Sequence, residues 1–224
     1  SSVNGGKISL SGGLTNSGTV KVLNDGIITV SDDCLVEGLG VIRGQETGLL
    51  QIGGSLLGNT ANSTQYLPMS EVRFNGIGTV SSPQFLEVMS EDRGSDPEGF
   101  NLNFVYGKLA LSNNTYVKLV DLSDNVPGST PEAIYINSLI VPTGTTLDLN
   151  GLTLYARGIQ ILGSVIGGTV NQIVDSGPIN FAEPTPGTIS LEGELDEWTF
   201  FGRTGQSITI VVNPGSSGIS PPFA

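Results

Sequence analysis

Short runs of alternating apolar and polar residues, each closed by a glycine-containing turn, recur along the chain. Residues 18–22 alternate in this way, the turn Asn24-Asp25-Gly26 follows, and residues 27–30 repeat the alternation. A period of two predicts β-strands, and Asn/Asp-Gly pairs favour tight turns because they tolerate positive φ. The first 58 residues therefore predict a series of short strands.

A second run of the same kind covers residues 137–174, with strand-like pieces at 139–141, 146–149 and 152–155. Short strands separated by glycine corners are typical of a β-solenoid, in which each coil buries its inward side chains against the neighbouring coils. The predicted fold class is all-β, with a β-solenoid, parallel β-helix-like body. Because the strand spacing is too irregular to fix a coil length, a β-sandwich throughout is the alternative.

Three further boundaries follow from changes in this pattern. Residues 59–136 interrupt the strands with longer loops, so we expect an elaborated section inside a body that spans residues 1–182. Residues 183–187, Glu-Pro-Thr-Pro-Gly, are typical of a linker, and residues 188–224 predict a partial β-sandwich module. Residues 84–90 fit a strand or a short helix begun at Ser82-Pro83, and the alternation favours the strand.

Composition supports a folded chain. Charged residues make up 13% of the 224 residues, the 32 glycines are about twice the usual share, and the mean hydropathy is +0.12. A disordered chain would combine low hydrophobicity with high charge.

The net charge of −12 repels phosphates, which argues against nucleic-acid binding. No apolar run is long enough to span a bilayer, so we expect no membrane insertion. The sequence opens Ser1-Ser2-Val3, as expected of a processed product or an internal fragment.

The sequence contains no histidine, which excludes Ser-His-Asp and Cys-His machinery and histidine-ligated zinc. A solenoid lyase could use Lys or Arg with acidic calcium ligands, but the nine basic residues are scattered along the sequence. We therefore expect no enzyme. The single cysteine, Cys34, lies in an apolar pattern and is expected to be a buried structural thiol.

Calcium is the metal that the remaining polar residues favour, because it prefers carboxylate and carbonyl oxygens. Two acidic loops are candidates, although neither matches an EF-hand or a glycine-rich calcium repeat, and solvated loops making Asx turns are the alternative. The candidate ligands are Glu91, Asp92, Asp96 and Glu98 in the first loop and Asp121, Asp124 and Asn125 in the second.

The tail carries a resemblance of its own. Residues 193–200, Gly-Glu-Leu-Asp-Glu-Trp-Thr-Phe, followed by Gly205-Gln206-Ser207-Ile208-Thr209-Ile210, resemble the opening of bacterial pre-peptidase C-terminal domains. These are small β-sandwiches appended to exported proteins. The resemblance covers about residues 187–212 and implies an exported protein whose sandwich begins here.

A second resemblance covers residues 109–170. The segments 113–121 and 139–151 are similar to parts of very large bacterial surface proteins with adhesin-like solenoid regions. This resemblance implies a non-catalytic structural or adhesive module at the cell surface or outside the cell. A carbohydrate-binding or carbohydrate-cleaving solenoid is the alternative, and a surface cleft that combines clustered acids with Lys or Arg would favour it.

Partners are predicted from the ends of the body. Terminal coils of a solenoid expose strand edges, and natural solenoids cap them or stack them on a neighbour. Residues 1–10 already read as turn plus strand, while Ile208, Ile210 and Val212 lack strands to cover them. We therefore expect association with other copies of the chain or with flanking domains through strand edges, and glycans are further candidate partners.

Overall fold

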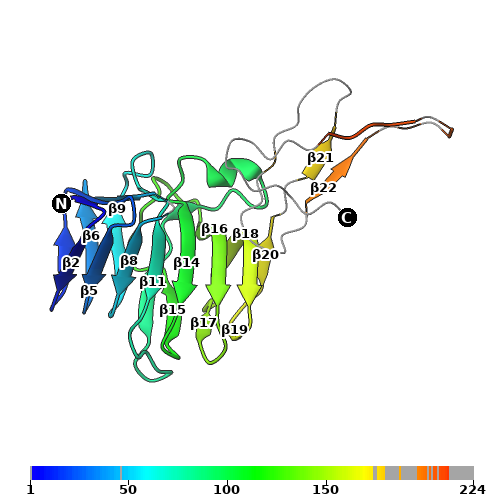
Figure 1. Cartoon of the computed structure of the whole chain (residues 1–224). Helices are drawn as coiled ribbons and strands as arrows, with labels where there is room; N and C mark the ends of the chain where they lie inside the picture. The colour runs from blue at the N-terminus through cyan, green and yellow to red at the C-terminus, as the bar shows by residue number, and fades with distance from the viewer. Residues whose placement is uncertain are drawn as a thin grey trace.

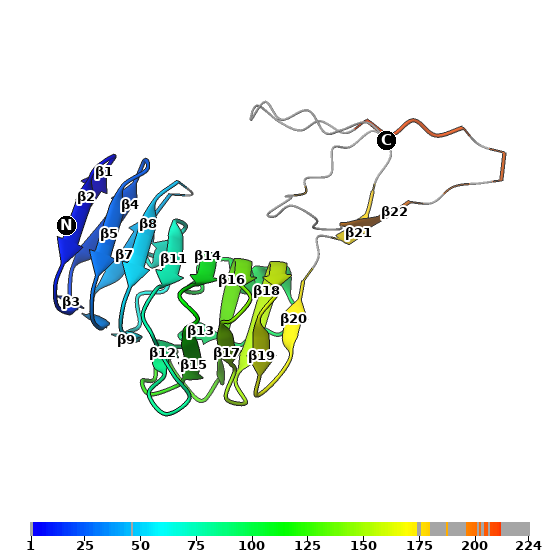
Figure 2. The same cartoon turned by 60° about the horizontal axis from the view of Figure 1, so that its bottom comes forward.

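The chain forms a parallel β-solenoid, as a computed structural model shows. The structure describes residues 2–45 and 47–173, and beyond them 176–179, 187, 196–200, 202, 204–205 and 207–211. In the described body the strands make three parallel sheets that run side by side along one axis (Figures 1 and 2). The all-β solenoid prediction is thus confirmed, and parallel pairing throughout the stacks rules out a β-sandwich body.

Sheet A is formed by the first four coils. Its strands, in order, are β1 (Ser2–Asn4), β4 (Thr19–Leu23), β7 (Val41–Gly44) and β10 (Leu67–Pro68).

Sheet B runs the length of the body. Its strands, in order, are β2 (Lys7–Leu10), β5 (Ile27–Val30), β8 (Leu49–Ile52), β11 (Glu71–Phe74), β14 (Tyr106–Leu111), β16 (Glu132–Val141), β18 (Thr153–Ile161) and β20 (Val170–Gln172), with β13 (Ser90–Glu91) antiparallel to the start of β16.

Sheet C completes each coil. Its strands, in order, are β3 (Leu14–Asn16), β6 (Cys34–Gly38), β9 (Leu56–Thr60), β12 (Gln84–Glu87), β15 (Tyr116–Val120), β17 (Thr146–Asp148) and β19 (Ser164–Ile166).

The register explains why the sequence could not give a coil length. Lys7 pairs with Ile27, Ile27 with Leu49, and Leu49 with Glu71, at spacings of 20, 22 and 22 residues. Glu71 then pairs with Lys108, because a long insertion precedes β14. The elaborated section 59–136 therefore contains regular coils together with the loops inserted between them. Residues 84–87 form strand β12, so the strand prediction for this segment is confirmed.

The core is a stack of similar rungs. Along sheet B the inward position is occupied by Ile28, Leu50, Val72, Leu109 and Leu139, each no more than 2% exposed. Alternate residues of each strand point inward, so a ladder of aliphatic side chains fills the interior and the hydrophobic effect stabilises every coil through its neighbours. Cys34 lies in sheet C, fully buried and unpaired, as expected.

In the turn at residues 24–26, the positive φ values belong to Asn24 and Asp25 and not to Gly26. Asn24 and Asp25 take the left-handed conformation, with φ of 44° and 57°. Gly26 is needed for space, because a Cβ there would lie 2.8 Å from the carbonyl oxygens of Val3 and Leu23. The Asn and Asp side chains tolerate positive φ, and the glycine admits the close approach of two coils.

A second, smaller core lies on the outer face of the last coils. Phe100, Val105, Ala133, Tyr135 and Tyr155 pack together there, on the side opposite the inward residues of β16 and β18. The insertion between β13 and β14 contains the 3₁₀ helix η1 (Pro97–Phe100), which brings Phe100 onto this face. The insertion is thus packed against the solenoid, not free in solvent.

Little of the predicted tail module falls within the described residues. The linker 183–187, apart from Gly187, lies outside them, as do residues 188–195 and several later positions of the segment that resembles a pre-peptidase C-terminal domain. Strand β21 (Ser176–Pro178) pairs in parallel with β22 (Glu197–Thr199), which joins the end of the predicted body to the predicted tail. Residues 207–211, expected to be a strand, are not in one. No described strand lies beside them, and Ile210 is 64% exposed.

Candidate functional site

The first acidic loop, at residues 90–101, is held together by its own hydrogen bonds. Asp92 accepts from the Gly94 amide and from the Tyr155 hydroxyl, and Asp96 caps η1 by accepting from the Glu98 amide. Glu91 pairs with Arg93 at 2.9 Å, while Glu98 accepts from the Asn101 side chain. In the structure, these four predicted calcium ligands hold the loop together, and Asp92 also binds Tyr155 of the second, smaller core.

The second acidic loop spans residues 121–131, between β15 and β16, and its anchor is Asn125. That side chain is 2% exposed, accepts from the Thr60 amide and donates to the carbonyls of Gly58 and Ser123. The loop therefore folds back onto the end of β9. The sequence predicts Asn125 as a calcium ligand, and in the structure its amide is used to fix the loop to the body.

Two buried glutamates that the sequence analysis did not select hold the same loop. Glu87, at the end of β12, accepts from the amides of Leu122 and Ser123. Glu132, the first residue of β16, accepts from the amides of Asn125 and Val126. Glu87 is 1% exposed and Glu132 is 6% exposed. A carboxylate within the apolar run 85–89 was the available signal for Glu87, because acids are rarely buried without a specific role.

Burial shifts the titration of both glutamates. It raises the pKa of Glu87 to about 7; the Ser123 and Leu122 amides oppose the shift, and the charges of Asp121 and Glu132 add to it. Burial also raises the pKa of Glu132, against the opposing hydrogen bonds from Asn125 and Val126. The Oε2 atom of Glu87 is buried without a hydrogen-bond partner. An unpaired buried carboxylate oxygen disfavours the charged form.

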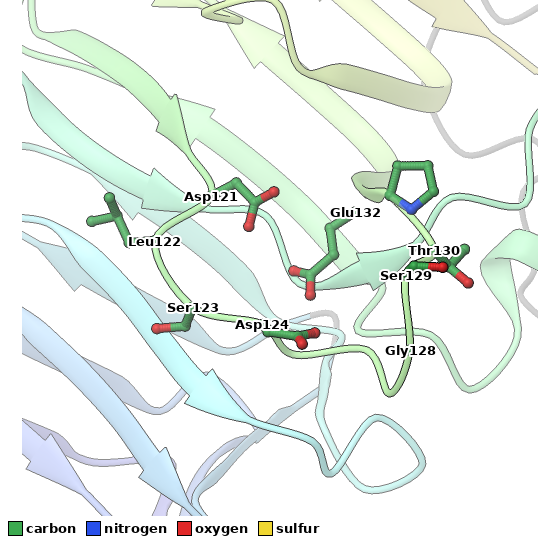
Figure 3. Close-up of a pocket in the computed structure, with 9 residues that line it drawn as sticks. Asp121, Leu122, Ser123, Asp124, Gly128, Ser129, Thr130 and Glu132 are labelled. Atoms are coloured by element: carbon green, nitrogen blue, oxygen red, sulfur yellow. The ribbon is translucent and has the colours of Figure 1, made fainter.

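A shallow pocket of about 280 Å³ opens beside this loop, and Asp121, Asp124 and Glu132 contribute its acidic side chains. In Figure 3 the carboxyl groups of Asp121 and Glu132 turn toward one another across it. No Lys or Arg lines it. Across the described ranges, no three His, Cys, Asp or Glu side chains form a group that could hold a metal ion, and calcium at either loop stays a prediction.

Basic residues do meet an acid on the outer face of sheet B. Glu71, whose side chain is 11% exposed, forms ion pairs with Arg73 and with Lys108. Hydrolysis of a glycosidic bond usually requires two carboxyl groups flanking it, and Glu71 is a single carboxylate already paired with two cations. This cluster is an ion-pair network that joins β11 to β14.

The other candidate site is the edge formed by the first coil. Strands β1, β2 and β3 end the order of sheets A, B and C at the same end of the body (Figure 2). Their rung is less covered than the next one, since Ile8 is 36% exposed whereas Ile28, directly beside it, is 2% exposed.

The hydrogen bonds of β2 show which of its backbone groups are free for a further strand. The carbonyls of Gly6 and Leu10 accept from Ile27 and Ser31 of the second coil. In a parallel pair the backbone groups of alternate residues point to the same side, so those of Lys7 and Ser9 point away from the body. The edge of β2 thus combines free backbone groups with a half-covered aliphatic rung.

Comparison of the chain with protein-family models, with curated proteins and with solved structures found no match. Within the described residues, no helix has the length and apolar character needed to cross a bilayer.

Proposed function

We propose that this chain is a non-catalytic structural or adhesive module of an extracellular or cell-surface bacterial protein, and that it associates through exposed strand edges. The observation that carries the proposal is the edge of the first described coil, which no described strand covers. Its three strands end three parallel sheets, and Ile8 there is only half covered, while the same position is buried in the next coil. Strand addition at such an edge takes affinity from backbone hydrogen bonds and register from alternate side chains.

Two further features support a structural role. The acids of the first loop bind its own backbone amides and a neighbouring hydroxyl, and the amides of the second loop bind Glu87 and Glu132 of the body, which stabilises both loops. A solenoid stabilised by nearest-neighbour contacts also tolerates long insertions between its coils, as before β14. The resemblance of residues 109–170 to adhesin-like surface proteins supports the proposed extracellular setting.

The alternative, a carbohydrate-binding or carbohydrate-cleaving solenoid, predicts a cleft in which acids and a Lys or Arg converge. The pocket beside residues 121–132 has the acids and no lining cation, while the ion pairs of Glu71 join two cations to a single carboxylate. These observations favour the structural module.

Sedimentation velocity of the 224-residue chain tests edge association. We expect a species larger than a monomer at high micromolar concentration. Ser9→Pro should return it to the monomer, because proline removes a backbone donor that points away from the body while the bonds to β5 remain. Ser9→Ala is the matched control and should associate like the parent. A monomeric parent would overturn the proposal, and association unaffected by Ser9→Pro would exclude the β2 edge.

A further inference from the structure

The last coil of the body leaves part of sheet B without a following strand. Strand β20 pairs with residues 154–156 of β18, and no described strand pairs with residues 158–161 on the side away from β16. Ile159 continues the inward ladder there and is 36% exposed, whereas Leu139 beside it is 0% exposed. The end of the body opposite the first coil thus has a half-covered rung of its own (Figures 1 and 2).

The backbone of this edge can accept a strand. The Leu162 amide donates to the Val141 carbonyl of β16. Because alternate residues of a strand direct their backbone groups to the same side, those of Ile159 and Ile161 point away from the body. Natural edge strands usually carry a charged residue or a proline that blocks further pairing. Residues 158–161, Gly-Ile-Gln-Ile, contain neither, so the edge is open to a further strand.

The inward pattern of sheet B indicates which sequence fits this edge. In each coil two apolar residues flank one other residue, as in Ile-Thr-Val at 28–30 and Ile-Gln-Ile at 159–161. Residues 208–210, Ile-Thr-Ile, repeat this pattern. The structure describes residues 207–211 outside any strand, and their two isoleucines are 37% and 64% exposed. This segment therefore has the side chains of a sheet B strand but belongs to no described sheet.

Resting on the strand-edge association proposed above, we propose that residues 207–211 of one copy add in parallel to residues 158–161 of a second copy, as the next strand of its sheet B. The apolar side chains of the added strand cover the half-covered rung, and Ile208 lies beside Ile159 of the second copy. Backbone hydrogen bonds give the affinity, and the alternate side chains fix the register.

The hydrogen bonds between existing coils define this register. The Ser31 amide donates to the Leu10 carbonyl, so the residue after the second inward position binds the second inward residue of the preceding coil. The same bond recurs between β16 and β18. Applied to the added strand, this rule pairs Ile210 with Ile161 and directs the Val211 amide to the Ile161 carbonyl.

A second copy, and not the same chain, is the occupant for two reasons. Within one chain, the described structure leaves both the segment and the edge unpaired. The contact surfaces also carry no charge, since residues 158–166 and 204–211 contain no acidic or basic side chain. Two copies that each have a net charge of −12 can therefore meet here without like charges facing one another.

Disulfide trapping reads this contact alone. In the proposed register Gln160 and Thr209 lie side by side on the outer face, at a Cα separation of about 5 Å that a disulfide can span. Gln160→Cys and Thr209→Cys chains, mixed and oxidised with glutathione disulfide, should give a mixed disulfide dimer that is identified by its mass. Gln160→Cys mixed with Glu37→Cys, an exposed change on β6, is the control and should lack it. Cys34 is buried and does not compete.

Sedimentation velocity of the full chain gives a second readout. Ile210→Asn should weaken association, because this side chain faces the half-covered rung. Thr209→Asn is the matched control, since successive side chains of a strand point to opposite faces, and it should associate like the parent. Ile210 is 64% exposed outside the body, so the solenoid should stay folded in both variants.

The outcomes separate this contact from association at β2. Absence of the mixed disulfide, with association that Ser9→Pro abolishes, would overturn this inference and leave the proposed function standing. A mixed disulfide together with association that ignores Ser9→Pro would support the inference and exclude the β2 edge. An internal disulfide in a dilute Gln160→Cys/Thr209→Cys monomer would show that the chain covers its own edge, which overturns donation between copies. Association unaffected by Ile210→Asn would contradict it as well.

Discussion

Glu71 of β11 receives the ammonium group of Lys108 at 2.9 Å, and the two residues are directly paired across neighbouring coils. Arg73 binds the other oxygen of the same carboxylate. The two cations come from different coils. Although a long insertion separates Lys108 from Glu71 in sequence, β11 and β14 are still paired as neighbouring strands of sheet B. The ion pair therefore fastens the coil before the insertion to the coil after it.

This triad predicts a coupled effect on stability. Lys108→Ala or Arg73→Ala alone should cost less than about 1 kcal/mol, because one cation remains and both are about one-third exposed. The double variant leaves Glu71 without a counter-charge, so we expect its loss to exceed the sum by about 0.5–3 kcal/mol. Urea unfolding of the four proteins measures the coupling. Strict additivity would show that the two cations act independently.

The aliphatic ladder predicts a difference between two isoleucines at equivalent positions of adjacent rungs. Ile28→Ala should cost about 2–5 kcal/mol, because Ile28 is 2% exposed and its removal leaves a cavity. Ile8→Ala should cost clearly less, since that side chain is 36% exposed at the open edge. Thermal or urea unfolding gives both values. Equal losses would mean that something covers Ile8 in solution, which oligomer analysis of the same samples would reveal.

Cys34 is predicted to resist thiol reagents in the folded chain. Burial, with a contribution from the charge of Asp33, raises its thiol pKa to about 12, so little thiolate exists at pH 8. We expect labelling with a maleimide at pH 8 to be negligible in buffer and complete in denaturant. Labelling in buffer at the denatured rate would contradict the buried position on β6.

Calcium at the two acidic loops remains a prediction of the sequence, and it has a direct test. A cation that binds only the folded state raises the melting midpoint, and a chelator reverses the rise. Asp96→Asn and Asp124→Asn then assign any rise to the first or the second loop. Asp25→Asn, in a turn outside both loops, is the control. A midpoint that responds to neither calcium nor chelator removes calcium from this protein.

The strands and turns of the body could be predicted from the sequence because they depend on local residue patterns. Alternation at residues 27–30 and the positive-φ residues Asn24 and Asp25 define a strand and a turn without reference to distant residues. The same holds for β12, where alternation alone decided between strand and helix. The lack of histidine excludes imidazole chemistry on composition alone, wherever the other side chains lie.

Tertiary structure decided everything that depends on which coil lies beside which. Register places Lys108 next to Glu71 and Ile8 next to Ile28, and it depends on how long each insertion is and where it folds back. The acids selected from the loops are at least partly exposed, and calcium at them stays a prediction, whereas Glu87 and Glu132, which adjoin apolar runs, became the buried pair. Burial and like-charge proximity are properties of packed coils, so a linear pattern specifies which residues are acidic and only the stacked coils determine which acids are buried near one another.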